Sequence, residues 1–308
     1  MGRDTTPGIA DGGAELGTRL LALLEQAERV LERLERVADP RPAPPDWQAA
    51  PAFRWRRRGA RCWLQPVPQP AVMRFDDLQG IDEQKARLER NTRQFVAGRP
   101  ANNVLLTGAR GTGKSSLVRA CLHAFAAKGL RLVEMDKADL VDLPELVDMV
   151  RGRGERFIVF SDDLSFDQGE PGYKALKSVL DGSVAGTADN VLIYATSNRR
   201  HLLPEYMHEN LQATHDESGE VHPGEGTEEK VSLSDRFGLW LSFYPFDQEH
   251  YLRIAEHWLQ SFGLSAQQAR AAHADALLWA LERGSRSGRI AWQFARDYCG
   301  RRRRVPGR

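Results

Sequence analysis

Cysteine is scarce in this sequence. The 308 residues include only Cys62, Cys121 and Cys299, which lie far apart along the chain. No two of them have the short spacing that zinc-binding cysteines show. We therefore expect free, reduced thiols of the kind found in cytoplasmic proteins.

Long apolar runs and an excess of one charge are also missing. No apolar run approaches the roughly 18 residues that a membrane-spanning helix needs, and the first residues, MGRDTTPGIADGG, lack the apolar core of a secretory signal. The 43 Lys and Arg residues are balanced by 42 Asp and Glu residues, so net charge does not draw the chain to nucleic acid or membranes. We expect a soluble, cytoplasmic protein with no membrane partner.

The sequence does contain short apolar runs that alternate with helical patterns. Hydrophobic residues make up 41% of the chain, which is enough for one full core and a smaller second unit. Continuous apolar strands with helices between them indicate a parallel sheet that is covered on both faces. The expected fold class is therefore α/β, with a three-layer parallel sheet. The predicted strands are Asn103–Gly108, Leu130–Asp136, Arg156–Asp163, Asn190–Asn198 and Leu239–Phe246.

The segments that flank this α/β region have other patterns. Apolar side chains three and four apart predict an amphipathic helix over Ala14–Ala38, which either pairs with a partner helix or packs on its own chain. A Pro-rich linker, Asp39–Trp47, follows it. Near the other end, three helices are predicted, each begun by a capping Asp or Ser: Asp247–Phe262, Ser265–Arg283 and Ser287–Tyr298. The chain thus divides into a helix and linker at 1–48, a basic and aromatic segment at 49–74, an α/β domain at 75–246, a helical unit at 247–300 and a basic tail at 301–308.

A glycine-rich loop joins the first predicted strand to a helical pattern that starts at Ser116. Its residues match G-x-x-x-x-G-K-[ST], and they are Gly108, Ala109, Arg110, Gly111, Thr112, Gly113, Lys114 and Ser115. Glycines let such a loop curl so that main-chain N–H groups converge on a β-phosphate, while Lys114 supplies charge and the Ser115 hydroxyl ligates Mg²⁺. The helix that follows directs its positive dipole end at the same anion. The alternative is a Gly-rich turn with an incidental lysine.

Polar residues end two other predicted strands. Asp162 would hold the Mg²⁺ and Asp163 would polarise the attacking water, although the same pair could instead cap the next helix. Thr196, Ser197 and Asn198 would lie beside the γ-phosphate if their strand lies between the other two. Asn198 could then orient the water, and the alternative is ordinary loop chemistry.

The base is expected to be adenine. GTP-binding loops read guanine through N-K-x-D after the acidic strand, and the similar string Asp136–Asp139 comes before that strand here.

Two arginines could neutralise the γ-phosphate in the transition state. Arg236 enters the last predicted strand and Arg289 begins the last helix, and either could instead be an ordinary surface residue.

The order of these motifs resembles that of the AAA+ ATPases over residues 75–300. The matching segments are Phe75–Asp82, the glycine-rich loop, Phe157–Asp163, Ala195–Asn198, Ser234–Phe237 and Ser287–Arg289. The resemblance implies a P-loop core with a helical lid, in which Phe75–Asp82, including Ile81, shapes the adenine end. It implies Walker A at Lys114 and Ser115, with Ser116 after them. The remaining implied roles are Walker B for Asp162 and Asp163, sensor 1 for Asn198, a finger into a neighbouring subunit for Arg236 and sensor 2 for Arg289.

Longer segments resemble a bacterial P-loop family catalogued as domain of unknown function 815. They are Asn91–Val118, Ser161–Phe166, Tyr194–Glu205 and Ser232–Gln248. One departure from most AAA+ motors is Asp163, where those motors have glutamate. Aspartate is one methylene shorter, so its carboxylate would lie farther from the water, and slow turnover is expected.

Three weaker signals remain open. The segment Phe53–Trp63 interleaves arginines with aromatics, which could bind nucleic acid or form a hairpin with its tryptophans on the core. The tail Gly300–Arg308 is basic and could either bind nucleic acid or be solvated. A polar insertion at 206–232 precedes Arg236. Its surroundings hold His201, His208, His215 and His222 at a spacing that does not favour a metal site.

The leading hypothesis is an ATPase that uses ATP and Mg²⁺, assembles as a nucleotide-dependent homo-oligomeric ring or spiral, and remodels or loads an unknown macromolecular partner. A second hypothesis is an ATP-governed switch with little turnover. A third adds DNA or RNA as the partner through the arginine-rich segments.

Overall fold

The computed structural model describes residues 19, 23–30, 45–59, 61–166, 170–182, 188–199, 202, 214–215, 221–222 and 233–302. The chain divides into two compact units, Met1–Pro44 and Pro45–Arg308. In the first unit residues 23–30 are helical, as predicted, and Leu23, Leu24 and Val30 are exposed. The other residues of the predicted helix Ala14–Ala38, apart from residue 19, and the first part of the linker lie outside the described residues.

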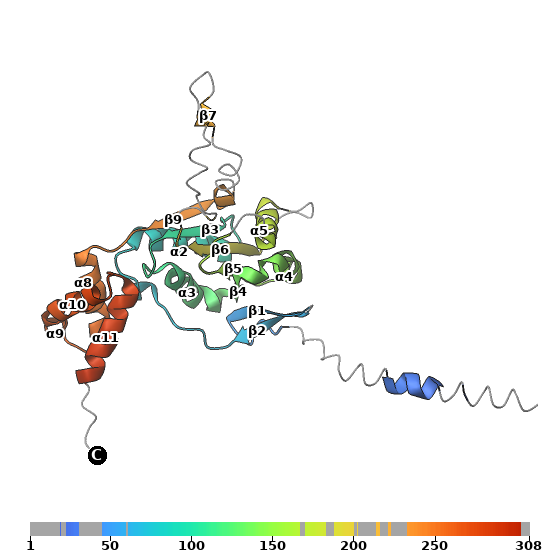
Figure 1. Ribbon diagram of the computed structural model, residues 1–308, viewed down its shortest axis with the longest axis horizontal. Helices are drawn as coiled ribbons and strands as arrows, with labels where there is room; N and C mark the ends of the chain where they lie inside the picture. The colour runs from blue at the N-terminus through green and yellow to red at the C-terminus, as the bar shows by residue number, and fades with distance from the viewer. Residues whose placement is uncertain are drawn as a thin grey trace, which may run out of the picture. The chain divides into compact units, whose positions relative to one another are not determined.

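Seven strands among the described residues of the second unit form one sheet, in the order β2-β1-β4-β5-β6-β3-β9 (Figure 1). Six of them, all except β2, are mutually parallel. Five of these six are the predicted strands, each slightly shorter than predicted. Their bounds are β3 Val104–Gly108, β4 Leu130–Glu134, β5 Arg156–Ser161, β6 Val191–Ser197 and β9 Leu239–Phe243. In this order β6 lies between β5 and β3, as the site hypothesis requires, so the carboxyl ends of these three strands are neighbours.

Helices cover both faces of the sheet. One face packs against α2 (Asp82–Val96) and α3 (Lys114–Phe125), which contribute Leu88, Phe95 and Leu117 to a core with the strands. The opposite face packs against α4 (Leu143–Val150) and α5 (Pro171–Asp181). Short 3-10 helices lie at Phe75–Asp77 (η1), Ala126–Lys128 (η2) and Lys137–Asp142 (η3). The predicted three-layer α/β fold class is confirmed.

The helices after Asp247 have a hydrophobic core of their own. They are α8 (Gln248–Ser261), α9 (Ala266–Ala271), α10 (His273–Glu282) and α11 (Gly288–Arg302). The prediction of one helix over Ser265–Arg283 was wrong, because the backbone leaves helical geometry at Ala272. Ala272 and the neighbouring Ala269 and Ala276 are fully buried, so the break lets two short helices pack against the same core.

The first two strands of the sheet form a hairpin, β1 (Ala52–Arg58) and β2 (Arg61–Val67). β1 adds in parallel to β4, so the hairpin extends the sheet at one edge. Trp55 is fully buried in the core shared with α4. This agrees with the hairpin alternative for Phe53–Trp63.

Two predictions fall wholly or mostly outside the described residues. Within the insertion 206–232, the structure describes Thr214–His215 (β7) and Val221–His222 (β8), which pair antiparallel. His201, His208 and tail residues 303–308 are not among the described residues. No helix in the described part of the chain is both long and apolar enough to cross a bilayer.

Candidate functional site

The predicted phosphate loop connects the carboxyl end of β3 to the first residue of α3. Gly108 has φ +124°, and a Cβ built there would lie 1.9 Å from the Phe243 carbonyl oxygen of β9. Gly111 has φ +74° and faces Ser287 of the helical unit. Both positions therefore require glycine for backbone conformation and for space. The resulting curled main chain at a helix start is the form that presents N–H groups to an anion.

Lys114 is held over this loop. Its Nζ donates to the carbonyl oxygens of Gly108 at 2.7 Å and Ala109 at 2.8 Å, and to Asn198 Oδ1 at 3.0 Å. Burial lowers the pKa of Lys114, while the negative charges of Asp162 and Asp163 oppose that shift. The ammonium group thus lies where β3 and β6 end, within reach of any anion in the loop.

The two residues predicted to hold Mg²⁺ are in direct contact. Ser115 Oγ donates to Asp162 Oδ1 at 2.6 Å, and Thr196 Oγ1 donates to the same oxygen at 2.5 Å. Hydroxyl and carboxylate oxygens are the hard ligands that Mg²⁺ prefers, and one or two protein ligands beside phosphates are its usual arrangement. The residues present therefore fit Mg²⁺.

Asp163 lies beside Asn198 at the carboxyl ends of β5 and β6. Asn198 Nδ2 donates to Asp163 Oδ1 at 2.5 Å, and the Arg110 guanidinium lies 4.0 Å from Asp163 Oδ2. Asp163 has φ +53°, a left-handed conformation that no other non-glycine residue adopts in the described part of the chain. Such backbone conformations are uncommon and cluster at functional sites. Asp163, Asn198 and Lys114 therefore form one connected polar group.

The helical unit contacts the loop from the other side. The Gly288 N–H donates to the Gly111 carbonyl oxygen at 2.9 Å. A Cβ built on Gly111 would lie 2.8 Å from Ser287 Cβ and 3.6 Å from Arg289 Cβ. Arg289, at the start of α11, is thus brought beside the phosphate loop by a main-chain contact.

The other predicted loop residues lie on the same structure. Thr112 Oγ1 donates to the Ala109 carbonyl oxygen at 2.8 Å, and Ser116 lies in the first turn of α3. Ile81, which precedes α2, is buried, and its Cδ1 would lie 3.4 Å from a Cβ built on Gly113. The segment Phe75–Asp82 thus adjoins the loop.

Arg236 is not part of this group. It precedes β9, whose Leu239 pairs with Val104 and whose Phe243 pairs with Gly108. Because β9 and β3 are parallel, Arg236 lies beyond the amino ends of these strands, roughly 15 Å along the strand direction from the loop. Its Nε donates to Asp181 Oδ1 at the end of α5. Arg236, the predicted finger, therefore lies at the amino ends of the strands, whereas the phosphate loop of the same chain lies at their carboxyl ends.

Two features of the site were missed or underused in the sequence prediction. Thr196 was placed near the γ-phosphate but given no role, yet it contacts both Asp162 and Asp163; polar residues at the end of a buried strand were the signal. The Phe243 carbonyl oxygen accepts the Ala109 N–H at 3.1 Å. No sequence signal marks a main-chain group of an apolar residue.

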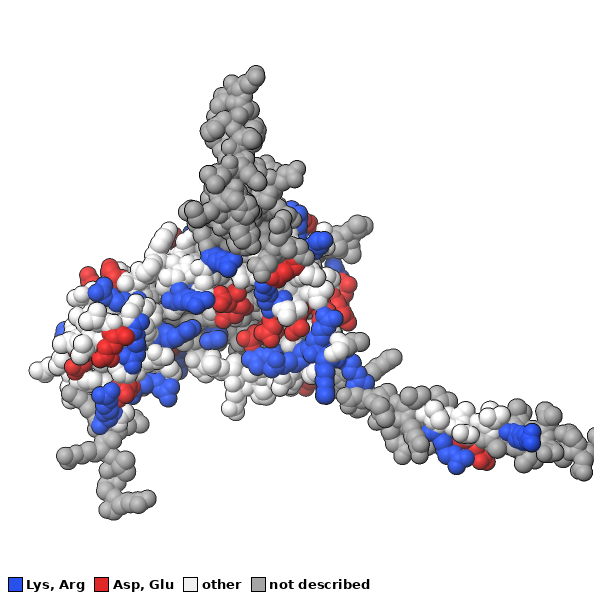
Figure 2. Space-filling view, in the orientation of Figure 1, with Lys and Arg blue, Asp and Glu red and all other residues white. Residues whose placement is uncertain are grey.

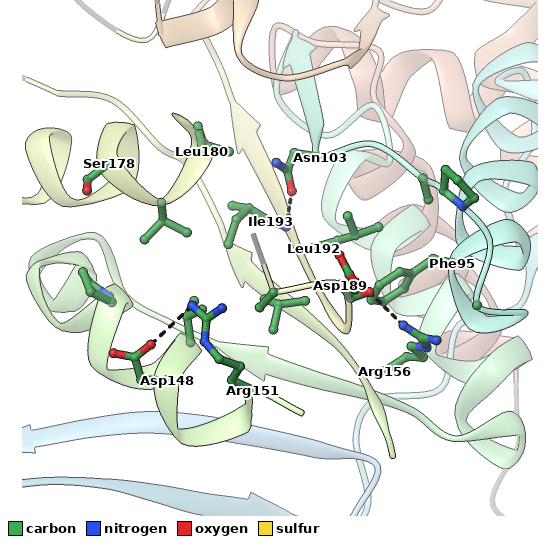
Figure 3. A pocket seen from close by; sticks show the side chains of 18 of the residues that line it. Phe95, Asn103, Asp148, Arg151, Arg156, Ser178, Leu180, Asp189, Leu192 and Ile193 are labelled. Carbon is green, nitrogen blue, oxygen red and sulfur yellow. Dashed lines mark hydrogen bonds and ion pairs between the residues drawn. The ribbon is translucent and has the colours of Figure 1, made fainter. Parts of the chain in front are cut away.

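A cavity of about 620 Å³ lies elsewhere, among the amino ends of β5 and β6, the start of β3, and helices α4 and α5 (Figure 3). Several of its polar lining residues bond within the chain. Arg156 donates to the Asp189 carbonyl oxygen at 2.7 Å, Arg151 lies 3.4 Å from Asp148, and Asn103 accepts the Ile193 N–H at 2.8 Å. Because the phosphate loop is at the carboxyl end of β3, this cavity is not the predicted nucleotide site.

Comparison with known proteins identifies the family. The family described as Protein of unknown function (DUF815) matches residues 48–302, and the chain belongs to this family, as its sequence predicted. No curated protein matches the chain.

Several solved structures are similar to it. RuvB of Thermotoga maritima is 17% identical with a TM-score of 0.46, and the alignment covers 72% of this chain and 63% of that one. The Trip13-containing HORMA:CdnC:Trip13 complex of E. coli MS115-1 is 15% identical with a TM-score of 0.44, covering 72% and 89%. ORC1 of Aeropyrum pernix, solved in complex with DNA, is 16% identical with a TM-score of 0.45, covering 75% and 63%. The chain thus spans 63% of the RuvB and ORC1 chains.

Proposed function

We propose that this member of the DUF815 family is a cytoplasmic AAA+ type ATPase. It binds ATP with Mg²⁺ at Gly108–Ser115, hydrolyses it slowly between subunits of a homo-oligomer, and uses the cycle to remodel or load a macromolecular partner. The observation that carries the proposal is the convergence of Lys114, Ser115, Asp162 and Asn198 through hydrogen bonds on one loop at one edge of the sheet. Three segments far apart in sequence meet there, and their residues are of the types that triphosphate chemistry needs.

Each residue has a part that follows from its position. The loop amides and Lys114 bind the β- and γ-phosphates, and on binding Lys114 exchanges its contacts with Gly108 and Ala109 for phosphate oxygens. Ser115 and Asp162 would hold Mg²⁺, which when bound neutralises charge on the phosphates. Asp163 accepts a hydrogen bond from the attacking water, and Asn198, already bonded to Asp163, orients that water.

The two arginines act from different chains. Arg289 is beside the loop of its own chain and would contact the γ-phosphate when the helical unit closes. Arg236 lies at the amino ends of the strands, away from the phosphate loop of its own chain. It can therefore reach only the nucleotide site of a neighbouring subunit. An arginine supplied in this way is worth on the order of 10³–10⁵ in rate, which makes turnover depend on assembly.

A switch with little turnover is the alternative, and Asp163 is the observation that favours it. The Asp163 carboxylate is short, lies on a left-handed residue and is already bonded to Asn198. Single-turnover kinetics with and without candidate partners distinguishes the two functions, because a switch binds ATP and retains it.

Nucleotide binding is tested by calorimetry with ATP and Mg²⁺. The wild-type chain should give a saturable heat that Lys114→Ala abolishes. Lys128→Ala is the matched control, because Lys128 carries the same charge in η2 at the other end of α3 and should leave binding unchanged. Absence of binding by the wild-type chain, or persistence of binding in Lys114→Ala, contradicts the proposal.

The shared site is tested by mixing two inactive variants. Arg236→Ala retains its own loop, Mg²⁺ ligands and Asp163, whereas Asp163→Asn retains Arg236. Each alone should hydrolyse little ATP, and an equal mixture should recover activity because the second variant supplies its arginine to the first. Asp181→Asn removes one partner that Arg236 has in its own chain, and this variant should remain active. A mixture no faster than its components would rule out a finger in trans.

A further inference from the structure

We propose that the β1–β2 hairpin binds a nucleic-acid strand through one of its two faces. This arginine face consists of Arg54, Arg56, Arg58 and Arg61 together with Trp63 and Gln65. The proposal concerns a surface separate from the nucleotide site, so it stands or falls independently of ATP hydrolysis.

The strand register assigns these residues to one face. Directly opposed pairs are Arg54 with Gln65, Arg56 with Trp63, and Arg58 with Arg61. Opposed residues of an antiparallel pair point to the same side, and alternate residues along a strand do too. The other face presents Phe53, Trp55 and Leu64, which are buried in the core. The hairpin is thus anchored by its apolar face, and the arginine face is turned away from that core.

The outer part of the hairpin projects beyond its neighbour in the sheet. β1 pairs with β4 only at Ala52, Phe53 and Arg54, and Arg54 is opposite Glu134, the last residue of β4. Residues from Trp55 onward therefore extend past the carboxyl end of β4. The phosphate loop follows β3 at the same, carboxyl end of the strands. In the sheet, β4, β5 and β6 lie between the hairpin and β3.

Of Arg54, Arg56 and Arg58, only Arg54 has an ion pair within the described part of the chain. Arg54 is paired with Glu134 through Nε and Nη2, both at 2.8 Å. Arg56 donates to the neutral Gln65 Oε1 at 2.9 Å, and within the described part of the chain no carboxylate lies within 4.0 Å of Arg58. Arg56 and Arg58, which make no ion pair in the described part of the chain, can therefore bind the phosphates of a polyanion.

Lys and Arg side chains gather over the region of this hairpin (Figure 2). Arginines at alternate strand positions are about 7 Å apart, close to two steps of 3.4 Å along a nucleic-acid strand. A planar guanidinium can also bond two phosphate oxygens at once.

Trp63 distinguishes a nucleic acid from other polyanions. It lies opposite Arg56 and is only partly buried, and none of the three hydrophobic cores of the described residues includes it. An indole among arginines on a strand face is a stacking platform for an unpaired base. An acidic protein segment would make no comparable use of it. The favoured ligand is therefore single-stranded DNA or RNA.

The test is fluorescence anisotropy of the full chain with a labelled oligothymidylate over a series of salt concentrations. The double variant R56Q/R58Q should bind at least about tenfold more weakly at low salt. The slope of log affinity against log salt should fall in magnitude by about 1.4, that is about 0.7 for each lost phosphate contact. The matched control R87Q/R270Q removes half-buried Arg87 of α2 and exposed Arg270 of α9, and it should keep the wild-type affinity and slope.

Trp63→Leu separates stacking from charge. It should weaken binding about tenfold with an unchanged salt slope, and thermal unfolding checks that each variant is folded. ATP affinity should be the same in R56Q/R58Q and the wild type. Equal weakening in R87Q/R270Q and R56Q/R58Q overturns the proposal. So does equal competition by polyglutamate of matched charge, which would indicate an acidic protein partner instead.

Discussion

The Thr196 hydroxyl connects the two adjacent aspartates Asp162 and Asp163. Thr196 Oγ1 donates to Asp162 Oδ1 at 2.5 Å and accepts the main-chain N–H of Asp163 at 2.9 Å. The next main-chain N–H, of Leu164, donates to the Thr196 carbonyl oxygen at 2.7 Å. Thr196 thus holds the turn after β5 to the end of β6, and through that turn it holds the left-handed Asp163 in place.

Thr196→Val should therefore slow ATP hydrolysis more than it weakens ATP binding. The variant keeps the shape but leaves the Asp163 N–H without its partner, so the free energy of unfolding should fall by about 1–3 kcal/mol. Turnover should fall about a hundredfold, as expected for a small displacement of a catalytic group. Single-turnover hydrolysis and calorimetry measure the two effects. Thr196→Ser retains the hydroxyl and should remain near the wild type, and equal rates for both variants would show that the bridge has no catalytic importance.

Gly111→Ala should weaken ATP binding by separating the helical unit from the loop. Its Cβ would lie 2.8 Å from Ser287 Cβ, and the Gly111 carbonyl oxygen accepts the Gly288 N–H. We expect the dissociation constant for ATP to rise about tenfold. Gly152→Ala is the control, because Gly152 has φ +72° against +74° for Gly111 but no atom within 4 Å of the built Cβ. Both variants should lose similar stability, about 1–2 kcal/mol, and only Gly111→Ala should bind ATP poorly.

Asp163→Glu should change rate and stability in opposite directions. The longer side chain brings its carboxylate closer to the attacking water and should raise the basal rate of hydrolysis. Glutamate tolerates a left-handed backbone less well than aspartate does, so the free energy of unfolding should fall by about 1 kcal/mol. Steady-state hydrolysis and chemical denaturation measure these effects. Asp163→Asn, which keeps the backbone preference, should be stable and inactive, and an unchanged rate in Asp163→Glu would contradict the argument from side-chain length.

Asp247→Ala should destabilise the protein in a pH-dependent way. Asp247 caps α8 by accepting the His250 main-chain N–H at 2.8 Å, which, with the His250 ring, holds the pKa of Asp247 below its ordinary value of 3.8. A carboxyl with a lowered folded-state pKa adds stability above its unfolded pKa and loses it as the pH falls through its folded pKa. The thermal midpoint of Asp247→Ala should thus lie below that of the wild type at neutral pH.

That difference should persist down to about pH 4 and shrink below 3.8. Differential scanning calorimetry across this range is the measurement. Glu249→Ala, in the same first turn of α8 but without the cap hydrogen bond, should show a smaller effect. A difference that stays constant below pH 3 would mean that the Asp247 carboxylate does not stabilise the helix through its charge.

Local spacing was sufficient to predict several parts of this protein. The phosphate loop is recognisable because Gly108, Gly113, Lys114 and Ser115 lie in one short segment, so the sequence itself shows their spacing. Five of the parallel strands are recognisable because strands buried on both faces must be apolar throughout. The caps at Asp247 and Ser265 are equally local, since a capping side chain bonds an N–H only three residues away.

Packing between distant segments decided the rest. The order of strands brings Thr196 to Asp162 and Phe243 to Ala109, contacts across 34 and 134 residues that no nearby pattern encodes. The hairpin register, not the composition of Phe53–Trp63, separates buried Trp55 from Trp63 among the arginines. The parallel pairing of β9 with β3 places Arg236 at the amino ends of these strands, away from the phosphate loop of its own chain. In each case the physical reason is that the order and register of the strands bring these residues together. Strand pairing satisfies main-chain hydrogen bonds over the whole domain and is not determined by neighbouring residues alone.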